Sequence, residues 1–328
     1  MQSPRSKNLF VVLATAMTLS TGASFAQNGN WPNQPIRFIV PYTPGGGTDT
    51  VTRHIAEKMS GNTKWTFLVD NKPGANGNIG MDAVAKSKPD GYTIGMGQTA
   101  NLAINSTLIP KMPFNASKDL VPVALVAELP TVMVVRADSP WKSVGDAVKA
   151  AKAKPGEVKQ ALAGNGTVGH LAGEMLSRQA GIQVLNIPYK GAAPAITDLI
   201  GGQTDYMFAT PQSVAGMIKG GKLRAIAVTS QKRLSFLPNV PTVAESGYKD
   251  FVAMDWKAIV APAGTPPEIV QRLNAEVGKA LAQPALVATL EAEGSTPMTG
   301  SPEQAAKFIK AEQEKWGSLI REAGIKPD

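Results

Sequence analysis

Cysteine is absent from this chain of 328 residues, and only two histidines are present, His54 and His170. Without cysteine there is no disulfide bond, no cysteine nucleophile and no lipid attached through cysteine. The two histidines are far apart in the sequence and no carboxylates cluster with them, so the ligand spacing of a metal site is missing. We therefore expect neither a metal nor a cofactor.

Aromatic residues are scarce, at 6% of the chain, although the formal net charge is +8. Lys and Arg are spread along the sequence, often beside Glu or Asp, as in residues 310–315. A nucleic-acid-binding protein would gather its basic residues into a stripe with aromatic side chains for stacking. We therefore expect a solvated basic surface and no nucleic-acid partner.

The apolar run near the N-terminus, Leu9 to Leu19, is shorter than the roughly 20 residues that a membrane-spanning helix needs. It follows Arg5 and Lys7 and precedes Ser24-Phe25-Ala26, which is the order of a secretory signal rather than a membrane anchor. We predict that residues 1–26 form a signal peptide cleaved after Ala26. The mature chain is expected to be a soluble monomer, located in the periplasm if the source is a bacterium.

The length and the alternation of elements predict the fold class. About 300 mature residues exceed the size at which one core usually keeps growing, so we expect two lobes. Short β-rich runs alternate with helical patterns, which predicts an α/β fold with a mainly parallel sheet flanked by helices in each lobe. Strands are expected at residues 36–40, 66–69, 93–96, 122–126, 131–136, 160–163, 183–188, 206–209 and 223–229. Helices are expected at residues 50–60, 77–85, 144–153, 167–180, 192–200, 213–219, 266–283, 284–293 and 301–323.

A glycine-rich turn, Pro41-Tyr-Thr-Pro-Gly-Gly-Gly-Thr-Asp49, joins the first expected strand to the first expected helix. The first N–H groups of a helix have no partner inside it, and the helix dipole places partial positive charge there, so the turn is suited to an anion. Capping by Thr48 or Asp49 without ligand contact is the alternative, but three glycines exceed what a cap needs. The turn matches neither a Walker loop nor Gly-x-Gly-x-x-Gly.

A second turn of the same kind, Ala163 to His170, follows about 120 residues later. Two such turns would hold both ends of a small dianion. His170 is interpreted as a neutral pocket or helix-packing residue, because no Gly-x-Ser-x-Gly or cysteine supplies a nucleophile for a catalytic base. His54 is interpreted as a surface residue beside Arg53 and Glu57.

The two turns lie in different halves of the chain, so the lobe boundary is expected between them. Residues 122–135 form an apolar extended run that is interrupted by Pro130 and suited to crossing between lobes, and residues 251–260 are suited to the return. We predict that lobe 1 comprises residues 27–127 and 253–328, and that lobe 2 comprises residues 128–252. Two crossings would form a hinge for domain closure.

Three more loops are expected on the same rim, because ligands of open α/β sheets bind outside the carboxyl ends of the strands. They are residues 72–80, 98–101 and 188–191, and a plain turn is the alternative for each. Asp205 either caps a turn or points inward. The candidate ligand-binding residues are Tyr42, Thr43, Gly46, Gly47, Asp49, Asn76, Gln98, Thr99, Gly166, Thr167, His170, Tyr189 and Asp205.

Several motifs resemble the solute receptors of the tripartite tricarboxylate transporter family, also called Bug or TctC proteins. They follow one another in order along nearly the whole mature chain. The matching segments are Ile-Val-Pro-Tyr-Thr-Pro-Gly-Gly-Gly-Thr-Asp (39–49), Asn-Lys-Pro-Gly-Ala-Asn-Gly-Asn-Ile-Gly (71–80), Lys-Pro-Asp-Gly-Tyr-Thr (88–93), Gly-Asn-Gly-Thr-Val-Gly-His-Leu-Ala-Gly-Glu (164–174), Pro-Tyr-Lys-Gly (188–191), Leu-Pro-Asn-Val-Pro-Thr-Val-Ala-Glu-Ser-Gly (237–247) and Ala-Pro-Ala-Gly-Thr-Pro (261–266).

The resemblance implies a two-lobed Venus-flytrap receptor that captures a small carboxylate and presents it to membrane permease subunits. Residues 42–49 would hold one carboxylate through main-chain N–H groups and water, and residues 166–170 the distal group. The sequence departs from the family at Asn76, where glycine is common, and at the variable residues 98–101, which bear on the choice of ligand. A mono- or dicarboxylate, an amino acid or an aromatic acid is expected. The alternatives are a secreted hydrolase or isomerase that uses His170, and a ligand-sensing module that signals to a partner protein.

Overall fold

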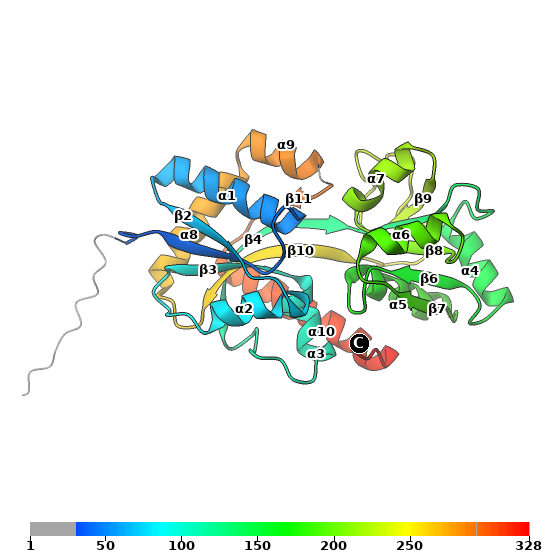
Figure 1. The fold of residues 1–328 in the computed structure, drawn as a ribbon, viewed down its shortest axis with the longest axis horizontal. Coiled ribbons are helices and arrows are strands. Elements are labelled where there is room, and N and C mark those ends of the chain that lie inside the picture. Colours follow the sequence, from blue (N-terminus) through cyan, green and yellow to red (C-terminus); the bar gives the residue numbers. More distant parts are fainter. Residues whose placement is uncertain (1–30, 293, 328) are drawn as a thin grey trace, which may run out of the picture. The chain divides into compact units, whose positions relative to one another are not determined.

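The computed structural model describes residues 31–327 apart from residue 293, and Figure 1 shows its course. The predicted signal peptide, residues 1–26, and its cleavage site lie outside the described residues. Within the described part of the chain, no helix combines the length and the apolar character that crossing a membrane demands. Both sheets belong to the contact unit that begins at Gln34.

The first sheet has six strands in the order β11-β4-β10-β3-β1-β2. They are β1 (Ile36–Val40), β2 (Phe67–Asn71), β3 (Thr93–Gln98), β4 (Leu120–Pro130), β10 (Met254–Pro262) and β11 (Thr296–Pro297). One face carries α1 (Gly47–Thr63), α8 (Pro267–Leu281) and α9 (Pro284–Ala292), and the other carries α2 (Asn78–Ala85), α3 (Asn105–Leu108) and α10 (Pro302–Ala323) (Figure 1). The short helices η1 (Ala75–Gly77) and η2 (Ala100–Ile104) lead into α2 and α3.

The second sheet has five strands in the order β7-β6-β8-β5-β9. They are β5 (Val132–Arg136), β6 (Lys159–Leu162), β7 (Leu185–Pro188), β8 (Tyr206–Ala209) and β9 (Leu223–Val228). Helices α6 (Ala192–Ile200) and α7 (Pro211–Lys219) cover one face, and α4 (Val144–Ala153) and α5 (Val168–Ala180) cover the other (Figure 1).

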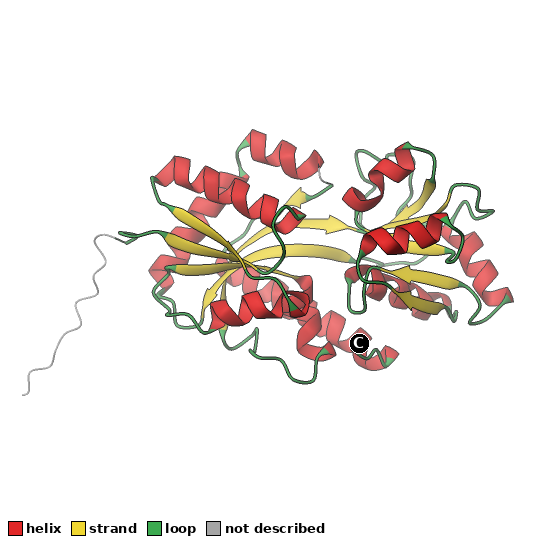
Figure 2. Ribbon diagram, in the orientation of Figure 1, coloured by secondary structure: helices red, strands yellow, loops and turns green. Residues whose placement is uncertain are grey.

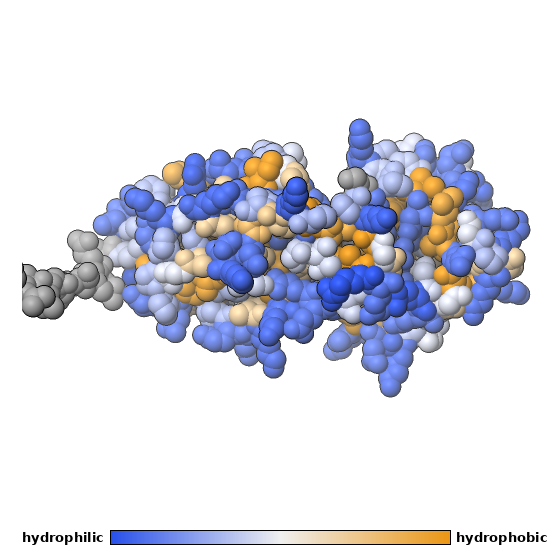
Figure 3. All heavy atoms as spheres, turned by 90° about the horizontal axis from the view of Figure 1, so that it is seen from below, coloured by the Kyte–Doolittle hydropathy of each residue, from blue (hydrophilic) through white to orange (hydrophobic). Residues whose placement is uncertain are grey.

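The central strand β8 shows how the pattern of apolar residues builds these layers. Successive side chains of a strand point to opposite faces of its sheet. Met207 and Ala209 accordingly join the apolar cluster under α6 and α7, while Tyr206 and Phe208 join the cluster that contains Leu171 of α5. A strand buried on both faces must be apolar throughout, as β8 is. Hydrophilic residues cover most of the face drawn in Figure 3, with hydrophobic ones in separate patches.

The α/β class is confirmed, but both sheets are mixed rather than mainly parallel. The pairs among β1, β2 and β3 and among β6, β7 and β8 are parallel, as expected. Strand β10 is antiparallel to β3 and β4, and β5 is antiparallel to β8 and β9. The physical reason is the crossing between sheets: β4 leaves the first sheet and β10 re-enters it, so these long neighbours run in opposite directions (Figure 2).

One threonine ties the crossing segments together. The hydroxyl of Thr229, which follows β9, accepts a hydrogen bond from the Thr131 N–H at 2.8 Å and lies 2.6 Å from the Ala253 carbonyl oxygen, to which it donates. Main-chain bonds join the same residues, from the Thr229 N–H to Thr131 and from the Ala253 N–H to Thr229. The segments that pass between the two sheets, at Thr131 and from Thr229 to Ala253, are thus hydrogen-bonded to each other where they cross.

Candidate ligand-binding cleft

A cavity of about 190 Å³ lies between residues of the two sheets, on the side where the parallel strands end. Pockets for drug-sized ligands are usually about 300 to 1,000 Å³, so this cavity suits a small molecule. Its first-sheet side consists of residues that follow β1 and β2, of residues at and just after the end of β3, and of one residue of β10. Its lining residues are Tyr42, Asn76, Gln98, Ala100, Thr131, Ala163, Thr167, Val168, Gly169, Ala192, Met207, Phe208, Ala209, Thr210, Ser213 and Asp255.

Tyr42 presents its phenol to the cavity from the turn after β1. Its oxygen accepts a hydrogen bond of 3.1 Å from the side-chain amide of Asn101, which leaves the phenolic proton for another acceptor. Burial and the negative charge of Asp255 raise the pKa of Tyr42 far above its usual range. The phenol is therefore a neutral hydrogen-bond donor at physiological pH.

The turn that carries Asn76 has a left-handed backbone. Ala75 has a φ of 46°, Asn76 of 54° and Gly77 of 88°, values that cost free energy at residues other than glycine. A Cβ atom at Gly77 would lie 2.4 Å from the Asn101 side-chain nitrogen and 3.0 Å from the Tyr42 hydroxyl. The glycine therefore allows the Tyr42–Asn101 pair to form beneath this turn.

Gln98 links the cavity wall to the start of α1. Its side-chain amide nitrogen donates to the hydroxyl of Thr48, a buried residue in the first turn of the helix. Its main-chain N–H donates to the Asn101 side-chain oxygen at 2.9 Å. Gln98 is thereby held in place by groups on both sides.

Three helices of the second sheet begin at the cavity: α5 at Thr167 to Gly169, α6 at Ala192, and α7 at Thr210 to Ser213. Helix N-termini carry partial positive charge and unpaired N–H groups. The Thr167 hydroxyl caps α5 by accepting from the His170 N–H at 3.3 Å, and it donates to the Gly164 carbonyl. This side of the cavity is therefore suited to negative charge.

The glycine-rich turn before α1 is held together from within. The Asp49 carboxylate accepts hydrogen bonds from the Gly45 N–H at 2.8 Å, the Asn71 amide at 2.9 Å and Arg53 Nε at 3.0 Å. Burial alone would raise the pKa of the Asp49 carboxyl, but these hydrogen bonds and the Arg53 charge hold the pKa below its usual range. Three other residues of this turn, Thr43, Gly46 and Gly47, were also predicted to bind the ligand. They are exposed and do not line the cavity.

His170 lies beneath the second turn and is 4% exposed. Its Nδ1 accepts the Gly166 N–H at 3.1 Å, so the proton of the neutral ring is on Nε2. Nε2 faces the Glu174 carboxylate at 3.7 Å. Hydrogen bonding by His170 and then Asn186 holds the pKa of the Glu174 carboxyl below its usual range against the effect of burial. His170 therefore orders the turn, and neither it nor Gly166 lines the cavity.

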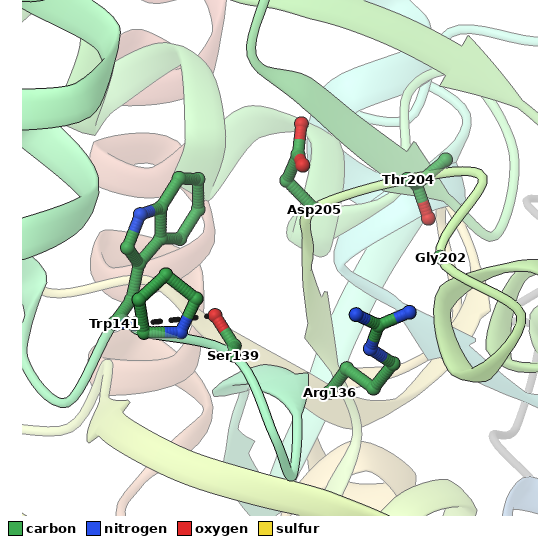
Figure 4. A pocket seen from close by; sticks show the side chains of 7 residues that line it. Arg136, Ser139, Trp141, Gly202, Thr204 and Asp205 are labelled. Carbon is green, nitrogen blue, oxygen red and sulfur yellow. Dashed lines mark hydrogen bonds between the residues drawn. The ribbon is translucent and has the colours of Figure 1, made fainter.

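Three other predicted residues have their own partners away from the cavity lining. The Thr99 hydroxyl accepts the Trp256 N–H at 2.7 Å. The Tyr189 hydroxyl donates to Asp198 at 2.7 Å, and burial together with that carboxylate raises the pKa of Tyr189 to about 12. Asp205 accepts the Lys159 N–H at 2.7 Å, and it lies at the amino ends of β6 and β8, beside a separate hollow with Arg136 (Figure 4).

The structure thus brings Tyr42, Asn76, Gln98 and Thr167 together at the cavity. Several polar residues of the lining were not predicted from the sequence, namely Thr131, Thr210, Ser213 and Asp255. A signal for Thr210 was present, because Thr210-Pro211 follows an apolar strand and has the pattern of an N-cap before proline. Asp255 had no such signal, because its position depends on where β10 is inserted in the sheet.

Two helix-flanked sheets, tied by crossing strands and facing a small cavity lined by both polar and apolar side chains, have the architecture of a Venus-flytrap solute-binding protein. Residues 51–325 match the family of tripartite tricarboxylate transporter receptors, TctC. The chain belongs to this family, and the predicted family resemblance is confirmed. Among the described residues, no group of three or more His, Asp or Glu side chains is arranged to hold a metal ion.

Similar proteins support the same assignment over nearly the full chain. Protein BugT of Bordetella pertussis is 39% identical over 297 residues, which is 90% of this chain and 91% of that protein. The structure of R. palustris Rpa4515 with adipate has a TM-score of 0.80 and 33% identity, and it covers 91% of this chain and 100% of that one. MatC of Rhodopseudomonas palustris with bound malate has a TM-score of 0.75 and 29% identity, with 88% and 100% covered.

Proposed function

We propose that the protein is a periplasmic receptor that binds a small carboxylate in the cavity and delivers it to the membrane permease subunits of a tripartite tricarboxylate transporter. The observation that carries the proposal is the convergence of three helix N-termini on a cavity that the Tyr42 phenol, Asn76 and Gln98 face from the first sheet. Relatives of the same fold hold adipate and malate.

Several donors are needed because each contributes little free energy. One helix terminus stabilises an anion by about 0.3 to 2 kcal/mol, and one hydrogen bond to a charged group contributes about 1.5 to 3 kcal/mol. Micromolar affinity requires about 8 kcal/mol. Groups from both sheets must therefore contact the ligand together, which favours closure of two lobes around it. We propose residues 27–127 with 253–328 as one lobe and residues 128–252 as the other.

Direct ligand contacts are assigned to Tyr42, Asn76, Gln98 and Thr167, with Thr210 and Ser213 added from the cavity lining. Asp49 orders the first glycine-rich turn, and His170 orders the second by accepting from the Gly166 N–H. The other predicted residues, which do not line the cavity, are Thr43, Gly46, Gly47, Thr99, Tyr189 and Asp205.

Binding without catalysis is favoured over hydrolysis or isomerisation. A general base must reach a substrate proton directly or through one water. His170 Nδ1 is occupied by the Gly166 N–H, and its ring is buried beneath the turn. The protein is accordingly proposed to act as a monomeric receptor without a cofactor, exported by a signal peptide that is cleaved after Ala26.

A calorimetric panel of mono- and dicarboxylates with the mature protein tests the proposal. The panel contains acetate, malate, succinate, adipate, benzoate, glutamate and aspartate, each paired with its amide as a control. At least one acid should bind reversibly with one-to-one stoichiometry, and its amide should bind far more weakly. Recovery of the acid unchanged after long incubation separates a receptor from an enzyme. If no acid binds, or if the bound acid is consumed, the proposal is wrong.

A further inference from the structure

A second hollow, of about 310 Å³, lies beside helix α7 and is formed mainly by apolar side chains. Its size falls within the range of about 300 to 1,000 Å³ that is usual for small-molecule pockets. The lining residues belong to β5, to α7 and to the loop that follows β9. The hollow is therefore built within the second sheet and its helices.

Helix α7 separates this hollow from the ligand-binding cavity. Thr210 and Ser213 at the start of the helix line the cavity, whereas Val214, Ala215 and Ile218 line the hollow. Helix residues three and four positions apart share one face, so the three hollow-lining residues form a single stripe along α7. Among the described residues, none lines both spaces. A molecule in the hollow would thus leave the cavity free.

The apolar walls of the hollow reach from the core to the surface. Val132 and Val214 are fully buried members of the apolar cluster under α7. Phe236 forms the outer wall and is 44% exposed. A Cβ atom at Gly294 would lie 3.2 Å from the Phe236 ring, so the backbone before β11 already packs against the edge of this ring. An apolar molecule in the hollow would remove the remaining apolar surface from water, which favours binding.

Lys219 gives the hollow a positive rim. Of the described residues in the lining, Lys219 alone carries a charge, and it is exposed in the last turn of α7. An apolar space beside one cation is complementary to a molecule with an apolar body and one carboxylate. A dicarboxylate is excluded, because its second charge would lie among apolar side chains without a partner.

We propose that this hollow is a second binding site, for a monocarboxylic acid with an apolar chain or ring. The apolar body lies against Val214, Ile218 and Phe236, and the carboxylate contacts Lys219. The site goes beyond the proposed function, since it shares no ligand-contacting residue with the cavity. Its occupant touches the same helix whose N-terminus faces the cavity.

Calorimetry of the mature protein with butanoate, hexanoate and octanoate tests the inference. Octanoate should bind saturably in the hollow, and each step of two methylene groups should strengthen that binding about tenfold, because one buried methylene contributes a factor of about four. Ala215→Phe places a ring in the hollow and should weaken octanoate binding there about tenfold or more. Ala285→Phe, on an exposed position of α9, is the matched control and should bind octanoate like the wild type.

The neutral probe octanamide tests the role of Lys219. Lys219→Gln should weaken octanoate binding about two- to fivefold, as expected for an exposed ion pair, and leave octanamide binding unchanged. Lys222→Gln removes an exposed lysine that does not line the hollow, and it should change neither affinity. Equal losses for octanoate and octanamide in Lys219→Gln would contradict the contact between Lys219 and the carboxylate.

Three results would overturn the second site. They are equal affinities for the three acids, octanoate binding that Ala215→Phe leaves unchanged, and a dimer in sedimentation experiments that Ala215→Phe separates, which would assign the hollow to a second copy of the chain. Melting temperatures are compared first. If Ala215→Phe does not fold, a crystal structure of the wild type with octanoate decides, since the acid lies either in the hollow or only elsewhere. Failure of every acid to bind in the cavity would refute the proposed function and leave this test unaffected.

Discussion

At the residue scale, the polar side chains around the cavity divide into those that face it and those that hold the facing groups in place. Tyr42 and Gln98 face the cavity, while Asn101 contacts both of them from behind. Asp49 and His170 each bind the N–H of a glycine in a turn, Gly45 and Gly166 respectively. In both glycine-rich turns, therefore, a buried side chain four residues further along the chain accepts a hydrogen bond from the glycine N–H and orders the turn.

The Asp49 carboxylate should stabilise the fold in a pH-dependent way. Asp49→Asn replaces one accepting oxygen by a donor group, which then faces either the donors of Gly45 and Arg53 or the Asn71 amide. We therefore expect a loss of about 1 to 3 kcal/mol in the free energy of unfolding at neutral pH. The folded pKa of Asp49 is lowered. Its contribution is therefore complete above the unfolded pKa of about 3.9 and disappears as the pH falls through the lower folded value.

Urea unfolding of the wild type and of Asp49→Asn between neutral and acid pH measures this difference. Glu57→Gln is the matched control, because it removes a carboxylate that is 66% exposed on the same helix. The control should differ little from the wild type at any pH. A stability gap for Asp49→Asn that stays constant down to the lowest pH would contradict the assigned role of the charge.

At the element scale, the helices and strands with strong local signals were predicted closely. Residues 36–40, 144–153, 192–200 and 206–209 have the bounds expected from the sequence. Helix α4 illustrates why, since Ser143 and Asp146 form a reciprocal capping box at its start and its apolar residues recur with helical spacing. Capping residues and the spacing of apolar residues, both visible within the element itself, are enough to predict such helices and strands.

Elements that depend on distant partners were predicted poorly. Residues 251–260 were expected to cross between lobes, but the strand pairing of β10 with β3 and β4 and the small strand β11 were not foreseen. The irregular turn η2 and the short helix α3 after residue 99 were also missed. Asp255 was overlooked for the same reason, because its place in the cavity follows from pairing with residues more than 100 positions away.

The Thr229 hydroxyl should stabilise the segments that cross between the two sheets. Thr229→Val keeps the shape of the side chain but leaves the Thr131 N–H and the Ala253 carbonyl without this partner. We expect the free energy of unfolding to fall by about 1 to 3 kcal/mol, because buried polar groups that lose a partner pay their desolvation cost. Chemical denaturation followed by tryptophan fluorescence measures the change.

Thr204→Val is the control for that experiment. The Thr204 hydroxyl is also buried, but it has no hydrogen-bond partner among the described residues. Its replacement should leave stability unchanged or raise it slightly. If the two variants lose equal stability, the hydroxyl of Thr229 has no special role at the crossing.

At the scale of the whole molecule, sequence and structure agree on the class of protein and differ on the details of the site. The predicted export signal, the alternating elements, the two glycine-rich turns and the family motifs indicated a two-lobed carboxylate receptor, and the family match establishes the TctC receptor family. The cavity, however, is lined by the starts of three helices of the second sheet and by an acidic residue of a crossing strand. These features arise only when distant segments meet.

A crystal structure of the mature protein with the tightest-binding acid of the panel tests the central claim most directly. The account predicts one ligand molecule in the cavity, with its carboxylate at the N-termini of α5, α6 and α7 and its other end near Tyr42 and Asp255. It also predicts that groups of both sheets contact that molecule. A ligand bound outside this cavity, or held by the second sheet alone, would contradict the account.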